Sequence, residues 1–189
     1  MAAAAIDEAV RNAVCVGVDV DKIAGLDNFC WPDPIESEKT PDGKFKLAQL
    51  VRANRELERI CRAYRLPCVS GKDSMKNDYG KGQDKISIPP TLLFSLFGDH
   101  PDVRNSATSD LKHPGDKLYL VGESLEELGA SELAFMMTEN GQSAGIGGNV
   151  PLLSDPDRLF SSYRALSKAI NSGVVKTAHD CSEGGVGVA

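Results

Sequence analysis

Residues 46–65, KLAQLVRANRELERICRAYR, show the strongest helical pattern in the chain. Their apolar side chains recur with the 3.6-residue period of a helix that packs one face against a core. Pro67 ends this helix, because proline lacks a backbone N–H and disfavours the helical conformation of the residue before it. The segment CVSG then predicts a strand that carries residues 72–74 at its tip. A long helix followed at once by a strand indicates a mixed α/β architecture. The apolar positions of the helix are Leu47, Leu50, Val51, Leu57, Ile60, Cys61 and Tyr64.

The segments on either side of this helix continue the alternation. IDEAVRNAV predicts a helix with Ile6, Val10 and Ala13 on one face. KIAGLDNF at residues 22–29 predicts a buried strand, and the proline-rich segment after it predicts a loop. TLLFSLF at residues 91–97 predicts a second buried strand, since the two prolines before it exclude a helix. The N-terminal half is therefore expected to run helix, strand, helix, strand, strand.

The C-terminal half predicts a second set of elements after a polar stretch at residues 99–116. That stretch is rich in turn-forming residues and is expected to be a linker or a long crossing loop. Asp155 is the expected N-cap of a helix, Pro156 its first residue and Gly173 its C-cap. The expected elements are strands at residues 117–122 and 174–180, helices at 129–140 and 155–173, and a turn into a helix at 181–189.

The charge and cysteine content exclude several classes of protein. The 189 residues carry a formal net charge of −6, which argues against a basic surface for nucleic acid. The 5 cysteines form no CxxC pair or zinc-ligand spacing, so we expect free thiols in a cytoplasmic protein. No apolar run approaches the ~20 residues of a membrane span. MAAAAI meets Asp7 and Glu8 too soon for a signal peptide, and we interpret it as the start of a helix taken from a longer protein.

The tip of the strand CVSG holds the first candidate site. Gly71 permits close approach of a ligand to the backbone, and Lys72 offers a cation. Asp73 is a candidate Mg²⁺ ligand, and Ser74 is a candidate hydrogen-bond donor. A phosphate-binding P-loop is excluded, because its first glycine would fall at Leu66 and its Ser/Thr position holds Asp73. A solvated loop is the alternative, and composition alone favours it slightly.

A second candidate site follows the last expected strand, in TAHDCSEGGVGVA at residues 177–189. Asp180 can hold Mg²⁺ between phosphates. The glycine pair at 184–185 can present free backbone N–H groups to a phosphate at the start of a helix. Ser182 suits a nucleotide site, but it suits the N-cap of that helix equally well. The two interpretations are compatible, and the residues alone do not separate them.

Two further patterns are weaker. Glu8 and Asn12, at positions i and i+4, could share a metal ion, but on spacing alone they indicate a solvated helix face. GIGGN at residues 145–149 lacks the preceding strand and following helix of a phosphate-binding loop, so we expect only a loop. His100 and His113 fall in the polar stretch and are expected to be exposed.

Five motifs, taken in order, resemble one family across most of the chain: DEAVRNAVCVGVD, GLDNFCWPDP, PCVSGKDSMKNDY, LGASELA and AHDCSEGG. The family is phosphoribosylformylglycinamidine synthase. LDNFCW and SGKDSMKN are specific to it, whereas AHD-x-S-[DE]-GG is shared with the wider aminoimidazole ribonucleotide synthetase-like superfamily. The resemblance implies that superfamily's α/β (α+β) fold and places the chain in the second repeat of the synthetase core. Residues 1–104 would be the later part of an N-type domain, 105–114 a linker, and 115–189 the first part of a C-type domain.

The resemblance also implies an activity and its partners. The family converts formylglycinamide ribonucleotide, glutamine and ATP into formylglycinamidine ribonucleotide, glutamate, ADP and phosphate in de novo purine biosynthesis. An ATP-dependent carbon–nitrogen ligase that uses Mg²⁺ is therefore expected. Its expected partners are the first synthetase repeat, which holds the family's catalytic histidine, and a glutaminase, either fused or separate. Without them we expect this chain to be inactive, and its N-type region implies that the isolated chain can form a homodimer.

Individual roles follow only by position in the matching motifs. These implied roles contradict the interpretation of Glu8 and Asn12 as part of a solvated helix face. They also favour a functional site over a solvated loop at residues 71–74. Lys72 lies where members of the family come close to the nucleotide or the metal, so the resemblance implies a location for Lys72 but no specific contact. The implied metal ligands are Glu8, Asn12 and Asp180, the implied nucleotide contacts are Ser182 and Gly71, and the implied substrate contacts are Ser74 and Asp73.

Two alternative functions stay open. In the first, this repeat is a scaffold that holds a nucleotide and Mg²⁺ without catalysis, a role that Glu8, Asn12 and Asp180 would suit equally well. In the second, the chain comes from a kinase of the same superfamily. LDNFCW and SGKDSMKN argue against the kinase, and dependence of the reaction on ammonia or glutamine would decide.

Overall fold

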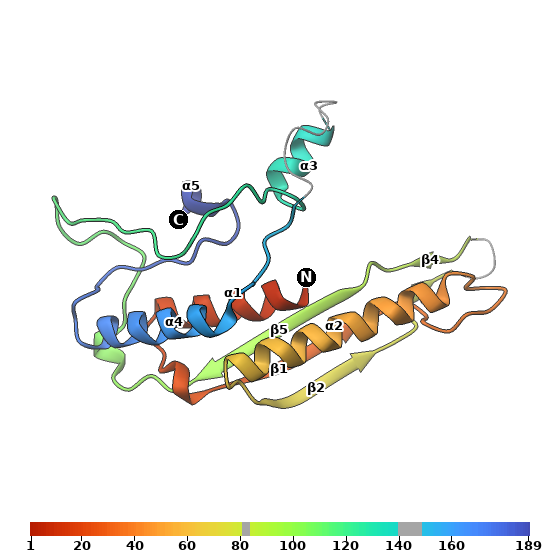
Figure 1. Cartoon of the computed structure of the whole chain (residues 1–189), viewed down its shortest axis with the longest axis horizontal. Coiled ribbons are helices and arrows are strands. Elements are labelled where there is room, and N and C mark those ends of the chain that lie inside the picture. The colour runs from red at the N-terminus through yellow and green to blue at the C-terminus, as the bar shows by residue number, and fades with distance from the viewer. Residues whose placement is uncertain (81–83, 140–148) are drawn as a thin grey trace.

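The computed structural model describes residues 1–80, 84–139 and 149–189, and it has the predicted mixed α/β architecture (Figure 1). Residues 145–148 of the GIGGN segment lie outside the described residues. The predicted order of elements in the N-terminal half is confirmed, with a short hairpin of two strands inserted before the last strand. The elements of that half are α1 (Ala2–Cys15), β1 (Ile23–Cys30), α2 (Gly43–Ala63), β2 (Cys68–Ser74), β3 (Asp78–Tyr79), β4 (Ile86–Ser87) and β5 (Thr91–Gly98). They are followed by α3 (Glu132–Glu139), α4 (Pro156–Asn171) and α5 (Gly185–Val188).

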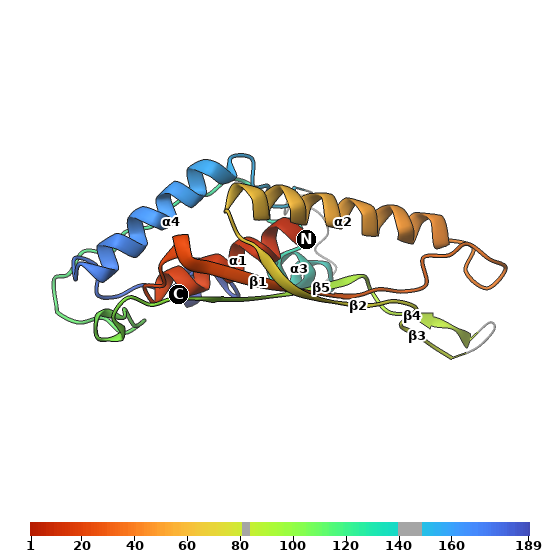
Figure 2. The same cartoon turned by 90° about the horizontal axis from the view of Figure 1, so that it is seen from below.

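The main sheet has the strand order β2-β1-β5. The central strand β1 pairs in parallel with β2 and antiparallel with β5. α1 and α2 lie along one face of the sheet, which we call the helix face (Figure 2). Phe29, Leu92 and Phe94 are buried there, whereas Leu93 and Phe97 are exposed on the opposite, open face. The expectation that the whole segment 91–97 is buried is therefore wrong, because successive side chains of a strand point to opposite faces.

The main core forms where α1, α2 and α4 meet. Ile6 and Val10 of α1 pack with Ile60 of α2 and Phe160 of α4 in one buried cluster. This packing explains why α1 forms with Ile6 and Val10 on its inner face, although the third inward position is Val14 instead of the predicted Ala13. Burial of these apolar stripes supplies the stabilisation that isolated helices of this length lack.

α4 has the predicted start and end. Asp155 Oδ1 accepts a 3.0 Å hydrogen bond from the backbone N–H of Arg158, and Pro156 is the first helical residue. The observed C-cap is Ser172, and Gly173, the predicted C-cap, follows it one position later with a φ of +74°. A left-handed residue at that place is the common helix terminator for which glycine is favoured.

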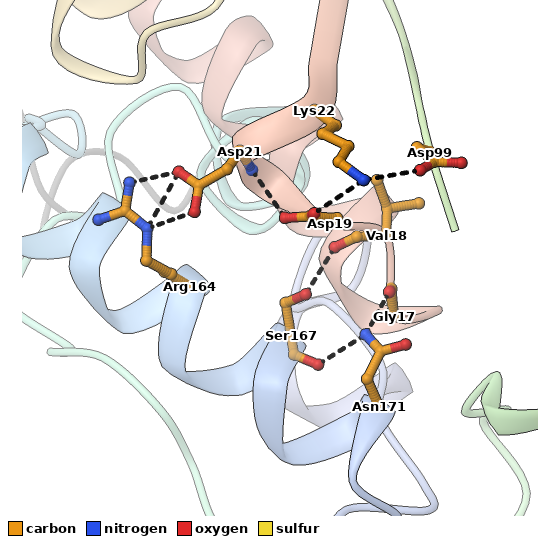
Figure 3. Close-up of polar contacts among 9 residues, drawn as sticks. All are labelled: Gly17, Val18, Asp19, Asp21, Lys22, Asp99, Arg164, Ser167 and Asn171. Atoms are coloured by element: carbon orange, nitrogen blue, oxygen red, sulfur yellow. Dashed lines mark hydrogen bonds and ion pairs between the residues drawn. The ribbon is translucent and has the colours of Figure 1, made fainter. Parts of the chain in front are cut away.

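Polar side chains of α4 fasten it to the connection between α1 and β1 (Figure 3). Ser167 Oγ donates a 2.7 Å hydrogen bond to the carbonyl of Val18, and Asn171 Nδ2 donates one of 2.7 Å to the carbonyl of Gly17. The Arg164 guanidinium forms an ion pair with the carboxylate of Asp21. These contacts join residues far apart in the sequence and fix the angle of α4 against the N-terminal elements.

Two strands predicted in the C-terminal half are not present. Residues 117–122 form no strand, and the consecutive side chains Leu118, Tyr119, Leu120 and Val121 are all exposed. Residues 174–180 contribute one isolated bridge, between Thr177 and Thr108, instead of a ladder. Both segments have strand-like composition, but a strand is stable only when a neighbouring strand supplies its backbone hydrogen bonds.

α2 begins at Gly43, earlier than predicted, and Leu47 and Val51 of its apolar stripe are exposed. His100 is not simply exposed, because its Nε2 lies 2.8 Å from the carbonyl oxygen of Val16. Within the described part of the chain, no helix combines the length and the apolar character needed to cross a membrane.

Candidate functional site

Glu8 and Asn12 lie one turn apart on α1, and both side chains are exposed. They line a groove of about 370 Å³ between α1 and β5, together with Leu92 and Phe94. The helical period brings residues i and i+4 to the same face, which explains why the two polar groups share this groove. An exposed carboxylate and an amide oxygen at this spacing can both bind one hard cation.

Asp180 is the most unusual polar residue of the predicted site. It is 8% exposed, and its Oδ2 atom has no hydrogen-bond partner among the described residues. Its other carboxylate oxygen, Oδ1, lies 3.7 Å from Nδ1 of His179. Buried carboxylate oxygens are normally satisfied, because leaving one without a partner is energetically unfavourable. The unpartnered oxygen therefore marks a position where a cation or a donor would be stabilising.

Arg11 connects the Asp180 segment to α1. Its Nη1 donates a 2.7 Å hydrogen bond to the carbonyl of Cys181, and its Nε lies 2.8 Å from Asp7 Oδ2. Burial opposes the charge of Arg11, but Asp7 and Asp180 outweigh it and raise the pKa of the guanidinium above its ordinary value. The chain around Asp180 is thus held beside the α1 face that also carries Glu8 and Asn12, since positions 8, 11 and 12 lie within one turn.

The three residues predicted as metal ligands all carry side-chain oxygen atoms. Glu8, Asn12 and Asp180 offer oxygen ligands, which Mg²⁺ prefers. In the described ranges, however, no three or more His, Cys, Asp or Glu side chains converge to hold a metal ion. A Mg²⁺ ion in nucleotide sites is bound through one or two carboxylates plus phosphates and water, so a partial protein shell is compatible with a metal–nucleotide complex.

Gly71 lies inside β2, opposite Asp27 of β1, and not in a turn. The expectation of a strand with residues 72–74 at its tip is corrected accordingly, because the hydrogen-bond ladder with β1 continues to Ser74. A Cβ atom on Gly71 would lie 2.9 Å from Oδ1 of Asp27. The absence of a side chain at Gly71 therefore makes room for the Asp27 carboxylate on the helix face.

The other predicted residues of β2 divide between the two faces of the sheet. Asp73 is paired with Phe29 and so lies on the helix face, whereas Lys72 is paired with Asn28 on the open face. Ser74 lies on the open face as well, but its Oγ donates a 3.1 Å hydrogen bond to Asn77 Oδ1. The Lys72 side chain is therefore exposed to solvent on the open face of the sheet.

The structure separates the predicted site residues into two groups. Glu8 and Asn12 lie on α1, which packs against β5. The residues 71–74 lie on β2, at the opposite edge of the sheet from β5. The chain thus brings Asp180 to α1, but it does not bring β2 to that groove.

Ser182 has a different local role from the predicted one. The N-cap of α5 is Gly184, whose φ is +79°, and no side chain caps this helix. Ser182 is exposed, and its carbonyl accepts a 3.0 Å hydrogen bond from the N–H of Gly185. Its predicted role as an N-cap is therefore wrong, and the hydroxyl is not used for capping.

Sequence reasoning missed Arg11 and Asp7, which position the site. Their i, i+4 spacing with opposite charges is the signal that could have indicated an ion pair on α1. The burial of Asp7 could not be read from this spacing, since it depends on Tyr64 and Tyr163, which contact it from α2 and α4.

Known proteins show similarity over the whole chain. Residues 113–189 match the family described as AIR synthase related protein, C-terminal domain. Phosphoribosylformylglycinamidine synthase subunit PurL of Deinococcus radiodurans is 35% identical over 193 residues, covering 100% of this chain and 24% of the relative. The subunits of the same name from Anaeromyxobacter sp. and Limosilactobacillus reuteri are 34% and 32% identical, each covering 98% of this chain and 22% of the relative.

These similarities confirm the resemblance that the motifs predicted, and the mixed α/β structure fits the fold of this family. The chain spans about a quarter of the length of the curated relatives that it matches. Residues 113–189 therefore resemble the C-terminal domain of AIR synthase related proteins, and the chain as a whole is similar to a segment of the phosphoribosylformylglycinamidine synthase subunit PurL.

Proposed function

We propose that this chain is part of the synthetase core of phosphoribosylformylglycinamidine synthase, the ATP-dependent carbon–nitrogen ligase and glutamine amidotransferase that forms formylglycinamidine ribonucleotide. The observation that carries the proposal is the buried Asp180 carboxylate with its unpartnered Oδ2, held beside α1 by Arg11. The similarity to PurL subunits along the whole chain supports the same assignment.

Within this proposal, Glu8, Asn12 and Asp180 hold Mg²⁺ on a bound ATP or ADP. The side chains fit this ion, since all three offer oxygen atoms and Asp180 has a buried oxygen left to satisfy. When bound, the Mg²⁺ would neutralise phosphate charge during phosphoryl transfer. Arg11 would keep the Asp180 segment in position through its bond to the carbonyl of Cys181.

The remaining predicted residues receive secondary roles. We propose Ser182 and Gly71 as nucleotide contacts and Asp73 and Ser74 as contacts of formylglycinamide ribonucleotide. Lys72, exposed on the open face of β2, would attract phosphate groups by its charge. Because β2 lies at the far edge of the sheet from α1, these contacts and the metal ligands would act on different parts of the reactants or in different sites.

The organisation of the complete enzyme is part of the same proposal. We assign residues 1–104 to an N-type domain, 105–114 to a linker and 115–189 to a C-type domain, and the family match at 113–189 supports the last of these. The other synthetase repeat and a glutaminase would complete the active enzyme. We also propose a cytoplasmic location, because all the cysteines are free thiols.

The test is the Asp180→Asn replacement in the complete subunit, assayed with ATP, Mg²⁺, ammonia and formylglycinamide ribonucleotide. A catalytic metal site predicts a large loss of kcat with an unchanged denaturant midpoint. A scaffold site predicts a lowered midpoint with kcat retained in the folded fraction. Glu38→Gln, which removes an exposed carboxylate elsewhere, is the matched control. Unchanged kcat and unchanged midpoint for Asp180→Asn would contradict the proposal.

A further inference from the structure

Two cysteines of different elements lie side by side at the end of α2. Cys61 is in the last turns of α2 and Cys68 is the first residue of β2. Their Sγ atoms are 3.8 Å apart, although both are free thiols. The chain reverses between them through Arg65, whose φ is +50°, and Pro67. The turn between α2 and β2 thus places the two thiols side by side in the folded chain.

Both thiols can be reached from solvent. Cys68 is exposed and Cys61 is half-buried. They line a common groove of about 560 Å³, whose wall also includes Arg62, Arg65 and Glu58. Glu58 lies 3.7 Å from Arg62, so the wall carries two cations and one carboxylate and is positive on balance. Guanidinium groups bind carboxylates well, so this groove suits a small thiol compound that carries carboxylate groups.

We propose that Cys61 and Cys68 form a reversible disulfide by exchange with a carboxylate-bearing small disulfide such as glutathione disulfide. In the first step the Cys68 thiolate attacks one sulfur of the small disulfide, whose S–S bond breaks and releases one small thiolate. In the second step Cys61, after losing its proton to water, attacks Cys68 Sγ and releases the second small thiolate. Two protein thiols are thereby oxidised and one small disulfide is reduced, and the two protons that Cys68 and Cys61 lose to water protonate the two released thiolates.

The environment of the pair sets the order of the steps. Burial raises the pKa of Cys68 above its ordinary value, although a hydrogen bond from the Cys61 thiol opposes this shift. Cys68 is the first nucleophile because it is the more exposed of the two sulfurs. Burial raises the pKa of Cys61 to about 12, with the neighbouring Cys68 adding to the effect. The reduced pair is therefore not stabilised as a thiolate, which favours persistence of the disulfide once it has formed. This inference does not depend on the proposed synthase function.

The test is oxidation of the full chain in glutathione buffers of increasing oxidised fraction, followed by alkylation and tryptic peptide mapping. Arg62 and Arg65 separate the two cysteines, so trypsin places them on the peptides ICR and LPCVSGK. We expect these peptides to appear joined by a disulfide. The Cys61→Ser variant should instead retain glutathione on Cys68, and Cys30→Ser should form the joined peptides like the wild type.

A second arm shows that the fold is responsible. In concentrated guanidinium chloride the same oxidation should lose its preference and join Cys61 and Cys68 to other cysteines as well. Wild-type chain that keeps both thiols free, or that keeps glutathione on Cys68 without forming the joined peptides, would overturn the proposal. This readout uses the wild-type protein, so it stands even if a serine variant fails to fold.

Discussion

Tyr163 donates a 2.7 Å hydrogen bond to Asp7 Oδ1 across a separation of 156 residues in the sequence. The same oxygen accepts a 2.6 Å hydrogen bond from Tyr64, and Arg11 pairs with the other carboxylate oxygen. One buried carboxylate thus joins α1, α2 and α4. Because Arg11 also bonds the carbonyl of Cys181, this network connects the core to the segment that carries Asp180.

Replacing Tyr163 by phenylalanine should destabilise the fold by roughly 1–2 kcal/mol, since it removes one hydrogen bond to a buried charged group but keeps the ring packing. Urea unfolding monitored by circular dichroism measures the change. Tyr119→Phe is the matched control, because Tyr119 is 79% exposed, and it should leave the free energy of unfolding unchanged. Equal midpoints for Tyr163→Phe and the wild type would show that the hydrogen bond contributes nothing.

Stability should fall in alkaline solution. Burial raises the pKa of Cys15 to about 11 and of Cys61 to about 12, from an ordinary value of 9.0. Burial and the charge of Asp7 also raise the pKa of Tyr64 and Tyr163. Below pH 9 these groups are protonated in both states, so their stabilisation is complete. Above pH 9 the unfolded chain releases protons that the folded chain keeps, and the free energy of unfolding decreases as the pH rises towards about 12.

The alkaline loss is measured by urea unfolding at several pH values in a reducing buffer. Cys61→Ser should have a shallower decline above pH 9 than the wild type, since one of the groups with a raised pKa is removed. Near neutral pH, the free energy of unfolding should change with pH equally in the two proteins. Parallel declines throughout would mean that the Cys61 thiol is not protected from ionisation by the fold.

Gly71→Ala should destabilise the protein by about 1 kcal/mol, because the new Cβ atom would lie 2.9 Å from Asp27 Oδ1 and force the Asp27 side chain to move. In an Asp27→Ala background the same replacement should be much less harmful. Gly187→Ala, where a Cβ atom meets nothing within 4 Å, is the control. If Gly71→Ala lowers the free energy of unfolding equally with and without the Asp27 side chain, this explanation is contradicted. The loss of backbone freedom at Gly71 would then be the favoured cause.

Local patterns predicted most of the helices correctly. α2 and α4 carry apolar residues at the helical period, and α4 also carries Asp155 and Pro156 at its start and a terminating glycine, Gly173, just after its end. Such signals need no information from distant parts of the chain. The predicted strands at 117–122 and 174–180 failed for the opposite reason, since a strand depends on a partner that its own residues do not specify.

The sequence proposed the residue types of the candidate site but could not give their arrangement. The motifs singled out Glu8, Asn12 and Asp180, and the structure holds Asp180 beside α1 through the contact between Arg11 and Cys181. That contact spans 170 residues and leaves no periodic trace in the sequence. The division of residues 71–74 between the two faces of the sheet likewise follows from their pairing with β1.

Calorimetric titration of ATP into this chain, with and without Mg²⁺, tests the proposed metal–nucleotide site most directly, with Asp180→Asn as the variant and Glu38→Gln as the control. We predict binding that requires Mg²⁺, that is lost in Asp180→Asn and that is retained in Glu38→Gln. Binding that is equally strong in Asp180→Asn, or no binding by the folded wild-type chain, would contradict a nucleotide site built on Asp180 in this chain.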